Sequence, residues 1–587
     1  MTGIDLTVEI CGMSGDGTIA AGALLNAAMA KTGLSVIAFD TYPAEIRGFG
    51  RCVTRSRVGS ESMLALADRT QVLVSLDDGQ SLSRVPFLDD GATVFLDSRP
   101  PALLEEGGSL AAHVEPGTNL MGVPYGDLSS GVSGSRRSRN IVALGAFAAA
   151  FGVPPAAFHE VIRAKFKAKG EKVAEINVAC FDAGYRYVLE HFAERVSPLL
   201  EPGDRGGDGE RQLLSGSVAV SRGALDAGVK NYFGYPITPA TPIMEYLAKA
   251  LPERGGKLVQ MEDEISSIGA VLGSFHAGTR AMTATSGPGF ALMTELITHG
   301  VMAEIPAVIV NAQRGGPSTG LPTKTEQSDL QAAVFGGPGD SARIVLAPTD
   351  VCECYRYTAT SFRLAEKYQT PVIVLTDFFL NNRVETVTLV PVTEKEIADG
   401  NIYPEGSGKG AYRRYEESAS GISPRAIPGQ EGFIHTVTGL EHSPAGGPDY
   451  TPENHQAMSE KRHRKILGAL GDLPPPEEFG DEDSLDVGVV AWGSTFGSAL
   501  EAVLKARAEG RKAGSLKIVA LFPYHAGRIR AFMNRCRVVL VPELNMEGQL
   551  ATLVGHLNAG DVVRMNAATG VPLTPTAIYE KIRELGA

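Results

Sequence analysis

The 587-residue sequence contains few cysteines, and none of them are paired. Its six cysteines are scattered without a Cys-x-x-Cys motif, and its histidines form no cluster at metal-ligand spacing. We therefore expect no metal ion and no iron–sulfur cluster bound by this chain itself. Cys352 and Cys354 lie two residues apart in a predicted helix, where they point to different faces, so we interpret them as buried free thiols.

Long apolar runs and an excess of basic residues are also absent. No stretch approaches the roughly 18 apolar residues of a membrane helix, and the first residues lack the basic and apolar segments of a signal peptide. The formal net charge of −13 disfavours binding to nucleic acid or to an anionic membrane. We expect a cytoplasmic protein that holds any anionic ligand in a local pocket.

Length and composition indicate several α/β domains. With 587 residues, 43% of them hydrophobic, the chain is large enough for three or four structural units. Apolar runs alternate with helical stretches, the pattern of parallel sheets flanked by helices. We predict a domain at 1–195, a linker at 196–214, a domain at 215–392, an irregular insertion at 393–484 and a C-terminal domain at 485–587.

Short apolar runs mark the predicted strands. In the first domain they lie at 6–11, 35–40, 71–76 and 93–96. In the second domain they lie at 232–234, 258–261, 281–285, 307–311, 343–347 and 371–376. In the C-terminal domain they lie at 487–491, 517–521 and 538–541.

Four segments of the second domain carry candidate functional residues, each at the end of a predicted strand. They are YPITP at 235–239, EDE at 262–264, TSGPG at 285–289 and QRGGP at 313–317. Ligands of open parallel sheets bind where the strands end, so we expect these segments to contribute to one site.

Two of these segments have a functional and a simpler structural interpretation. Pro236 and Pro239 restrict the backbone around Thr238 just before a predicted helix, which presents a hydroxyl beside free helix-start N–H groups. The alternative is a proline-rich turn with Thr241 as the N-cap. Gly287 and Gly289 allow close approach to the backbone, or form an ordinary turn.

Arg314 is the candidate anion ligand. It follows the apolar run at 307–311 and is flanked by glycines and hydroxyl side chains. A guanidinium in such surroundings can hold a carboxylate at two points. The alternative is an arginine at a solvated strand end.

Together these segments resemble the α subunit of the 2-oxoacid:ferredoxin oxidoreductases, particularly the 2-oxoglutarate type. YPITP is the most specific match. The resemblance implies a pyrimidine-binding-type domain of thiamine diphosphate enzymes and a transketolase C-terminal-like domain, while residues 1–195 look like the γ subunit of the family, fused in front. The match continues through QRGGPSTGLPTKTEQSDL at 313–330, SPR at 423–425, GLEH at 439–442 and PELNMEGQ at 542–549.

The resemblance assigns cofactor contacts to the second domain. Glu264 would hydrogen-bond N1′ of the aminopyrimidine ring of thiamine diphosphate and favour the imino tautomer that removes the thiazolium C2 proton. Glu262 is the nearby competitor for this role. Pro236 and Ile237 would also contact the cofactor.

The same resemblance places the substrate on neighbouring residues. Thr238 and Arg314 would hold the α-carboxylate and carbonyl of the 2-oxoacid, with Tyr235 and Thr323 close by. Arg47, in the segment YPAEIRG at 42–48, could reach the distal end of the substrate.

The resemblance further implies a partner subunit. Gly-Asp-Gly at 15–17 is not followed at the family spacing by Asn-Asn, which occurs only at 381–382, so the chain lacks a convincing diphosphate–magnesium motif. A separate β subunit would hold the diphosphate, Mg²⁺ and a [4Fe–4S] cluster, in an (αβ)2 assembly. The complex would convert a 2-oxoacid, coenzyme A and oxidised ferredoxin into acyl-CoA, CO2 and reduced ferredoxin, or run the reverse carboxylation.

Other functions stay open from the sequence. The same chemistry could act on pyruvate, a branched-chain 2-oxoacid or indolepyruvate. Gly12, Gly15 and Gly17 between a strand and a helix, with Asp40 ending the next strand, could form a nucleotide or coenzyme A site, although a structural turn is the simpler interpretation. A non-catalytic scaffold that binds a nucleotide at this loop is the alternative from another class.

Overall fold

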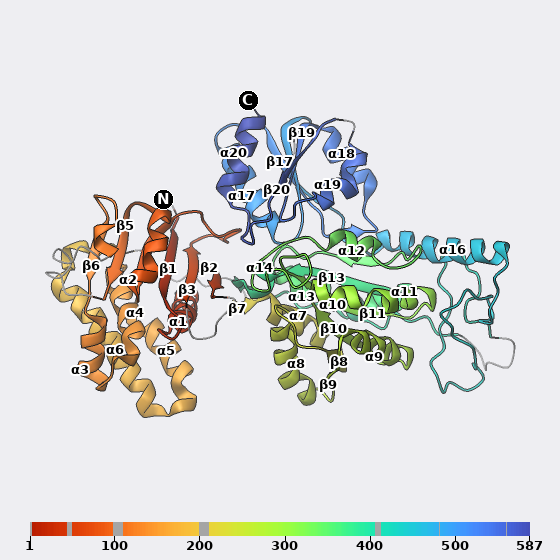
Figure 1. Ribbon diagram of the computed structural model, residues 1–587, viewed down its shortest axis with the longest axis horizontal. Helices are drawn as coiled ribbons and strands as arrows, with labels where there is room; N and C mark the ends of the chain where they lie inside the picture. Colours follow the sequence, from red (N-terminus) through yellow and green to blue (C-terminus); the bar gives the residue numbers. More distant parts are fainter. Residues whose placement is uncertain are drawn as a thin grey trace. The chain divides into compact units, whose positions relative to one another are not determined.

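The computed structural model forms two compact units. It describes residues 3–43, 50–97, 110–198, 211–404, 412–480, 482–558 and 560–586. One unit comprises Met1–Leu214 with Arg383–Thr388, and the other comprises Ser215–Asn382 with Leu389–Ala587. The described residues build sheets of eight, seven and five strands with helices packed against them (Figure 1), which confirms the predicted mostly parallel α/β class.

The first unit contains the eight-stranded sheet, in the order β6-β5-β4-β1-β3-β2-β14-β7. This sheet is not parallel throughout, because β3 pairs antiparallel with both β1 and β2. Its sequence RCVTRSRVG interleaves arginines with apolar residues, so the search for apolar runs missed it. The bounds are β1 Asp5–Met13, β2 Ser35–Thr41, β3 Arg51–Gly59, β4 Thr70–Ser75, β5 Leu88–Leu96, β6 Asn119–Gly122, β7 Gln212–Ser215 and β14 Val384–Val387.

Helices of the first unit pack closely through small residues. Helices α4 (Arg139–Ala150) and α6 (Glu171–His191) come together where Gly145 faces the carbonyl of Phe181 and Gly184 faces that of Val142. An added Cβ would collide with the backbone at either glycine. The apolar side chains of these helices and of α1 (Thr18–Lys31) form one core with β1.

The seven-stranded sheet of the second unit has the order β18-β12-β13-β11-β10-β8-β9. All its pairs are parallel except that of β12 with β18, and its six predicted strands are confirmed. Strands β11 and β13 are buried along their whole length, as expected of a sheet covered on both faces. The bounds are β8 Asn231–Gly234, β9 Lys257–Gln260, β10 Ala281–Thr285, β11 Ala307–Gln313, β12 Ile344–Leu346, β13 Pro371–Asp377 and β18 Ala520–Phe522.

Two groups of helices accompany this sheet. One group packs α7 against both α8 and α13, and the other joins α9, α10 and α11. Cys354 is buried in α13, as predicted, whereas Cys352 is only partly buried, and neither cysteine forms a disulfide. The bounds are α7 Gly216–Asp226, α8 Thr241–Glu253, α9 Glu264–His276, α10 Gly287–Leu292, α11 Thr294–Met302 and α13 Val351–Tyr368.

The five-stranded C-terminal sheet has the order β15-β17-β16-β19-β20. The predicted strand at 517–521 was wrong, because β17 ends at Lys517 and the chain then forms β18 in the seven-stranded sheet. The apolar run at 517–521 thus contributes residues to strands of two different sheets. The bounds are β15 Glu477–Phe479, β16 Leu485–Ala491, β17 Ala513–Lys517, β19 Cys536–Glu543, β20 Val562–Asn566, α17 Thr495–Ala508, α18 Ala526–Asn534, α19 Gln549–Val554 and α20 Pro575–Leu585.

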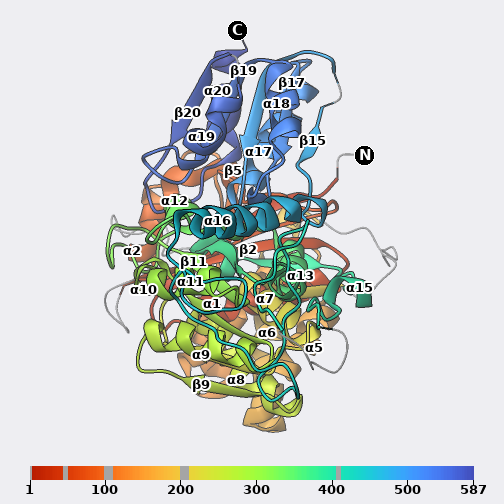
Figure 2. The same ribbon diagram turned by 90° about the vertical axis from the view of Figure 1, so that its right-hand side faces the viewer.

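The insertion between these two sheets is held by side chains rather than by strands. From residue 412 to α16 (Pro452–Leu467), the described chain is irregular. Buried arginines attach it to the sheet domain: Arg414 Nη2 donates to the Glu304 carbonyl at 2.8 Å, and Arg425 Nη1 to that of Phe275 at 2.8 Å. Helix α16 then runs beside α12 (Leu330–Phe335) in both views (Figures 1 and 2).

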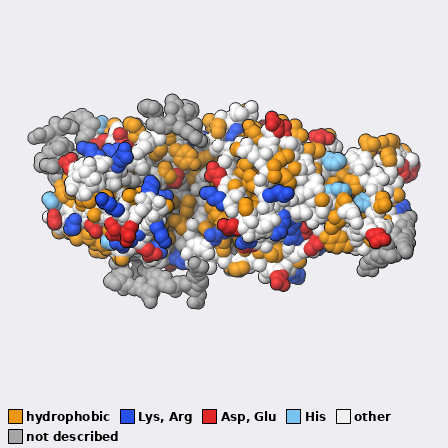
Figure 3. Space-filling view, turned by 90° about the horizontal axis from the view of Figure 1, so that it is seen from below, with side chains coloured by type: hydrophobic (Ala, Val, Ile, Leu, Met, Phe, Trp, Pro, Cys, Tyr) orange, Lys and Arg blue, Asp and Glu red, His pale blue; other side chains and the backbone are white. Residues whose placement is uncertain are grey.

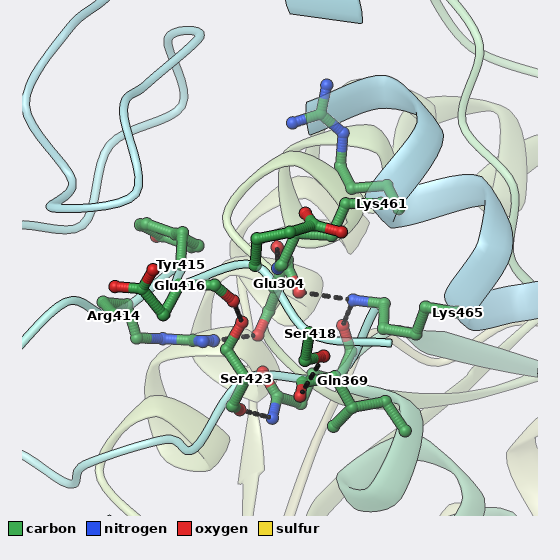
Figure 4. Close-up of polar contacts among 12 residues, drawn as sticks. Glu304, Gln369, Arg414, Tyr415, Glu416, Ser418, Ser423, Lys461 and Lys465 are labelled. Carbon is green, nitrogen blue, oxygen red and sulfur yellow. Dashed lines mark hydrogen bonds and ion pairs between the residues drawn. The ribbon is translucent and has the colours of Figure 1, made fainter. Parts of the chain in front are cut away.

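One buried carboxylate anchors α16. Glu304 Oε1 lies 2.5 Å from Lys461 Nζ, and Glu304 Oε2 lies 2.7 Å from Lys465 Nζ (Figure 4). The two lysines are one helical turn apart and therefore share a face. Burial by itself raises the pKa of Glu304, but the charges of Lys465 and Lys461 outweigh it and hold that pKa well below its usual range. Glu304 also adopts φ of 53°, a conformation that this contact network must stabilise.

Replacing Glu304 by glutamine should loosen the insertion. The change leaves two buried ammonium groups without a counter-charge, which costs about 3–5 kcal/mol of local stability. Because the folded pKa of Glu304 is lowered, its contribution is present above the unfolded pKa of about 4.5 and is lost as pH falls through the folded pKa. Hydrogen exchange of peptides within 412–467 measures this loss.

The matched control for this experiment is Glu396→Gln. Glu396 pairs with Arg356 at 2.8 Å, but both side chains are partly exposed, so its loss should cost less than about 1 kcal/mol. Equal effects of the two substitutions would show that the buried cluster does not anchor the insertion.

Charged side chains of both signs occur on the described part of the face drawn in Figure 3. On the side drawn in Figure 3, Lys and Arg side chains are interspersed with Asp and Glu. Among the residues that the structure describes, none of the helices is long and apolar enough to cross a membrane.

Candidate active site

The seven-stranded sheet brings the four candidate segments to one edge. Strands β9, β8, β10 and β11 are parallel neighbours in that order, so their carboxyl ends lie together. YPITP follows β8 and EDE follows β9, while TSGPG begins in the last residue of β10 and QRGGP in that of β11. This is the edge at which open α/β sheets bind their ligands.

Glu264 is placed by the start of a helix. It is the first residue of α9, and Asp263 caps that helix by accepting from the Ser266 N–H at 2.7 Å. The cap orients the first turn so that the Glu264 side chain points inward, where it is only 5% exposed. Glu262 is exposed two residues earlier. Of the two carboxylates, Glu264 is therefore the one enclosed by protein.

The TSGPG turn lies against the Glu264 carboxylate. Thr285 Oγ1 donates to Glu264 Oε1 over 3.5 Å, a long contact, and an added Cβ at Gly289 would collide with both side chains. Ser286 Oγ is buried in the same turn without a protein partner. Gly289 thus leaves room beside a buried acid and an unpaired hydroxyl.

Arg314 reaches back to the YPITP segment. Its Nη1 donates to the Thr238 carbonyl at 2.8 Å, and its Nε is buried without a protein partner. The side chain is 7% exposed. Burial lowers the pKa of the Arg314 guanidinium, and the nearby Asp329 carboxylate opposes this shift. A buried arginine with a free N–H is suited to bind an anionic group.

The other residues predicted for this site differ in their exposure. Thr238 is exposed and Tyr235 is 43% exposed. Thr323 Oγ1 is buried without a protein partner on the loop that follows Arg314. The alternative of Thr241 as an N-cap was wrong, since Thr241 opens α8 and Ala240 precedes it without a side-chain cap.

A cleft of about 560 Å³ lies beside Arg314. One wall comes from the seven-stranded sheet domain and the other from the C-terminal domain of the same unit. Asp329 faces the cleft next to Arg314, and burial raises the pKa of its carboxyl. The lining includes Gly287, Pro288, Arg314, Ser318, Glu326, Asp329, Asn545, Met546, Glu547 and Gln549.

The C-terminal wall and Asp329 are what the sequence missed. Both lie in segments recognised in the sequence, QRGGPSTGLPTKTEQSDL and PELNMEGQ, but nothing in the spacing indicated that the two segments meet. Only the packing of the two domains brings them within one cleft.

Side chains of the glycine-rich loop and of the neighbouring helices pack closely around this loop in the first unit. Asp16 Oδ2 accepts from the Met13 N–H at 2.9 Å, and Asp16 also pairs with Arg139 at 2.5 Å. An added Cβ at Gly12 would approach Thr18 Oγ1 at 2.7 Å, and one at Gly17 would approach Asn140 Nδ2 at 2.6 Å. An acidic side chain therefore already accepts from one N–H of this loop, and its negative charge opposes the binding of a phosphate there.

Two further sequence candidates belong to this unit. Asp40 accepts from Thr54 Oγ1 at 2.6 Å, and burial raises the pKa of its carboxyl to about 6. Arg47 lies outside the described residues. Within the described ranges, we find no group of three metal-ligating side chains.

Family models assign all three regions of the chain to one class of protein. A model described as pyruvate flavodoxin/ferredoxin oxidoreductase, thiamine diphosphate-binding, matches residues 222–461. Pyruvate ferredoxin/flavodoxin oxidoreductase matches residues 7–187, and pyruvate:ferredoxin oxidoreductase core domain II matches residues 486–573. The class is therefore that of the thiamine-dependent oxidoreductases that act with ferredoxin or flavodoxin.

Full-length relatives define the family within this class. The structure of 2-oxoglutarate:ferredoxin oxidoreductase from Magnetococcus marinus, with 2-oxoglutarate, coenzyme A and succinyl-CoA bound, is 37% identical over 99% of this chain and 100% of its own, with a TM-score of 0.91. The 2-oxoglutarate oxidoreductase subunit KorA of Mycobacterium tuberculosis is 32% identical over 99% of this chain and 91% of its own. Subunit alpha of 2-oxoacid:ferredoxin oxidoreductase 2 from Aeropyrum pernix is 32% identical over 99% and 98%. The chain belongs to the 2-oxoacid:ferredoxin oxidoreductase family as an α subunit, which confirms the resemblance seen in the sequence.

Proposed function

We propose that this chain forms, together with a β subunit, a 2-oxoglutarate:ferredoxin oxidoreductase. The substrate is a 2-oxoacid, which loses CO2 and passes its acyl group to coenzyme A while two electrons leave singly for ferredoxin. The reverse carboxylation uses the same groups. The relatives from Magnetococcus marinus and Mycobacterium tuberculosis, both described by 2-oxoglutarate, support this choice of substrate.

The residues around Glu264 fit the aminopyrimidine edge of thiamine diphosphate. A buried carboxylate, the space left by Gly289 and the unpaired Ser286 hydroxyl match a polar ring that needs a proton-accepting partner. When bound, the cofactor supplies the nucleophilic carbon and the electron sink for decarboxylation. Glu264 would hold the proton shared with N1′, and Pro236 and Ile237 would border the ring. We assign pyrimidine binding to residues 215–392, with 1–195 as the γ-type domain and 485–587 as the C-terminal domain.

Arg314 is proposed to hold the α-carboxylate of the 2-oxoacid. Its Nη1 is fixed by the Thr238 carbonyl, while its buried Nε stays available to a ligand in the cleft. Thr238, Thr323 and Tyr235 would line the path of the substrate. This arrangement orients the carboxylate for loss and restricts the reacting carbonyl to one pose.

A partner subunit is required by the chemistry. In this proposal, which follows the family resemblance, Mg²⁺ and a [4Fe–4S] cluster would lie on a β subunit in an (αβ)2 complex. Ferredoxin would take its electrons from there. The cleft of about 560 Å³ beside Arg314 is the proposed entry for the thiol arm of coenzyme A.

The observation that carries the proposal is the placement of Glu264 and Arg314 at one sheet edge. The test is 2-oxoglutarate- and coenzyme A-dependent reduction of a viologen dye by this chain with and without its β partner. Activity confined to the pair would support a shared site. Activity of this chain alone would overturn the division of roles.

The same assay separates the alternatives. Higher kcat/KM with pyruvate, a branched-chain 2-oxoacid or indolepyruvate would change the substrate and keep the family chemistry. Binding of a nucleotide by the glycine-rich loop, together with an assembly that has no 2-oxoacid turnover, would favour the scaffold instead. The occupation of that loop by Asp16 argues against it.

Substituting Gly289 by alanine should weaken binding of thiamine diphosphate. The added Cβ collides with the Glu264 carboxylate and the Thr285 hydroxyl, and such overpacking costs about 1–3 kcal/mol, or roughly 5- to 150-fold in affinity. Titration of the apo complex with the cofactor measures this loss. Gly273→Ala is the control, because its Cβ meets nothing within 4 Å. Equal affinities in the two variants would remove Gly289 from the cofactor site.

A further inference from the structure

Gln327 is buried at the junction of the seven-stranded sheet domain and the C-terminal domain, with every side-chain polar atom bonded. Its Nε2 donates to the Trp492 carbonyl at 3.2 Å, and its Oε1 accepts from Thr495 Oγ1 at 2.7 Å. Oε1 also accepts from the Leu544 N–H at 3.4 Å. All three partners belong to the C-terminal domain, whereas Gln327 follows the loop that starts at Arg314.

The backbone around Gln327 is held from the same side. Its N–H donates to the Leu544 carbonyl at 2.7 Å, and its carbonyl accepts from Asn545 Nδ2 at 3.0 Å. Gln549 Nε2 donates to the Ser328 carbonyl at 2.7 Å, and Gln549 Oε1 accepts from the Gln331 N–H at 3.0 Å. The PELNMEGQ segment therefore forms hydrogen bonds with the backbone of Gln327, Ser328 and Gln331.

Glu326 and Asp329, close to Gln327 in the sequence, are held near Arg314 by hydrogen bonds of their own. Glu326 Oε2 accepts from the Gly316 N–H at 3.2 Å, which ties the two ends of the loop together. Asp329 is fixed by Asn311 Nδ2 at 3.1 Å and donates its own N–H to Gln313 Oε1 at 2.9 Å. Glu326 and Asp329 lie on either side of Gln327 in the sequence. A shift of the backbone at Gln327 would therefore move both carboxylates relative to the Arg314 guanidinium.

We propose that Gln327 is a positioning residue through which the C-terminal domain sets the geometry of the 2-oxoacid site. Gln327 does not touch the substrate. It acts by fixing the loop of residues 314–329 against the segments that follow β16 and β19, so that Arg314 and Asp329 face the cleft in one arrangement. This inference rests on the proposed role of Arg314 in binding the substrate carboxylate.

Gln327→Met in the αβ complex tests the proposal. Methionine has a similar volume and removes the side-chain hydrogen bonds while leaving the backbone ones in place. We expect the KM for 2-oxoglutarate to rise about tenfold, with kcat changed less than about threefold, since the loss falls on ground-state positioning. Hydrogen exchange of peptides within 314–331 should become faster in the same variant.

Gln369→Met is the matched control. Gln369 is equally buried and donates through Nε2 to the Ser423 carbonyl at 2.6 Å, but it holds the insertion rather than the loop of Arg314 (Figure 4). It should leave KM and the exchange of peptides 314–331 unchanged. Thr495→Val removes one bond to Gln327 from the opposite side, so its effect on KM should be smaller and should not add to that of Gln327→Met.

The outcomes separate this inference from the proposed function. A KM that rises no more in Gln327→Met than in Gln369→Met, or unchanged exchange of 314–331, would overturn the positioning role. If Arg314→Lys leaves KM unchanged, the substrate assignment fails, while the exchange data still decide whether Gln327 holds the loop. Additive effects of Gln327→Met and Thr495→Val on KM would also count against the proposal.

Discussion

Glu264→Gln should remove nearly all 2-oxoacid-dependent ferredoxin reduction by the αβ complex. The amide keeps the shape of the side chain but cannot accept the proton that a carboxylate shares with the ring nitrogen of the cofactor. General acid–base contributions of this kind are worth about 10²–10⁴-fold, and kcat should fall by that factor. The measurement is dye or ferredoxin reduction at saturating cofactor, with cofactor affinity determined separately by titration.

The neighbouring Glu262→Gln is the control for this loss. Glu262 lies two residues away in the same EDE segment, but its side chain is exposed, whereas Glu264 is buried beside Thr285 and Gly289. Its substitution should change kcat less than about twofold, as expected for a solvated carboxylate. A large loss in Glu262→Gln together with an active Glu264→Gln would assign the cofactor contact to the other carboxylate.

Arg314→Lys should reduce kcat/KM for 2-oxoglutarate by about 10²–10³-fold. Loss of a buried, charge-assisted contact costs about 2–5 kcal/mol, and lysine cannot reproduce the donor geometry of the guanidinium. It would also lose the bond of Arg314 Nη1 to the Thr238 carbonyl, which keeps the side chain in place. Steady-state kinetics with 2-oxoglutarate as the varied substrate give the size of the effect.

The pattern across substrates identifies which group Arg314 binds. The α-carboxylate is common to all 2-oxoacids, so kcat/KM should fall by a similar factor for 2-oxoglutarate and for pyruvate. A loss confined to 2-oxoglutarate would place Arg314 at the distal carboxylate. Arg343→Lys serves as the control, because this buried arginine bonds to Ser341 and to the Gly336 carbonyl, which do not line the cleft.

Local patterns were sufficient to predict the strands of the sheet domain and the edge at which the candidate residues lie. The strands at 281–285 and 307–311 are rich in apolar residues, YPITP directly follows the strand β8, and QRGGP begins in the last residue of β11. Since parallel neighbours end at one edge, the placement of Glu264 and Arg314 at the same edge could be predicted from the sequence.

Other elements could not be read from local patterns. Strand β3 carries Arg55 and Arg57, which are paired with Glu9 and Asp5, so its burial depends on partners more than 40 positions away. The apolar run at 517–521 divides between two sheets because β18 pairs with β12. Both cases are tertiary contacts overriding a local signal.

The sequence by itself determined the fold class, the family and the two residues on which catalysis is proposed to depend, because these follow from short apolar runs and contiguous motifs. Only the tertiary structure decided that Glu264 rather than Glu262 is buried. It alone also showed that the PELNMEGQ segment forms hydrogen bonds with Gln327 and Ser328, which follow Arg314 in the same loop. Burial and long-range hydrogen bonds depend on which surfaces meet when separate domains pack, and no spacing within a single segment contains that information.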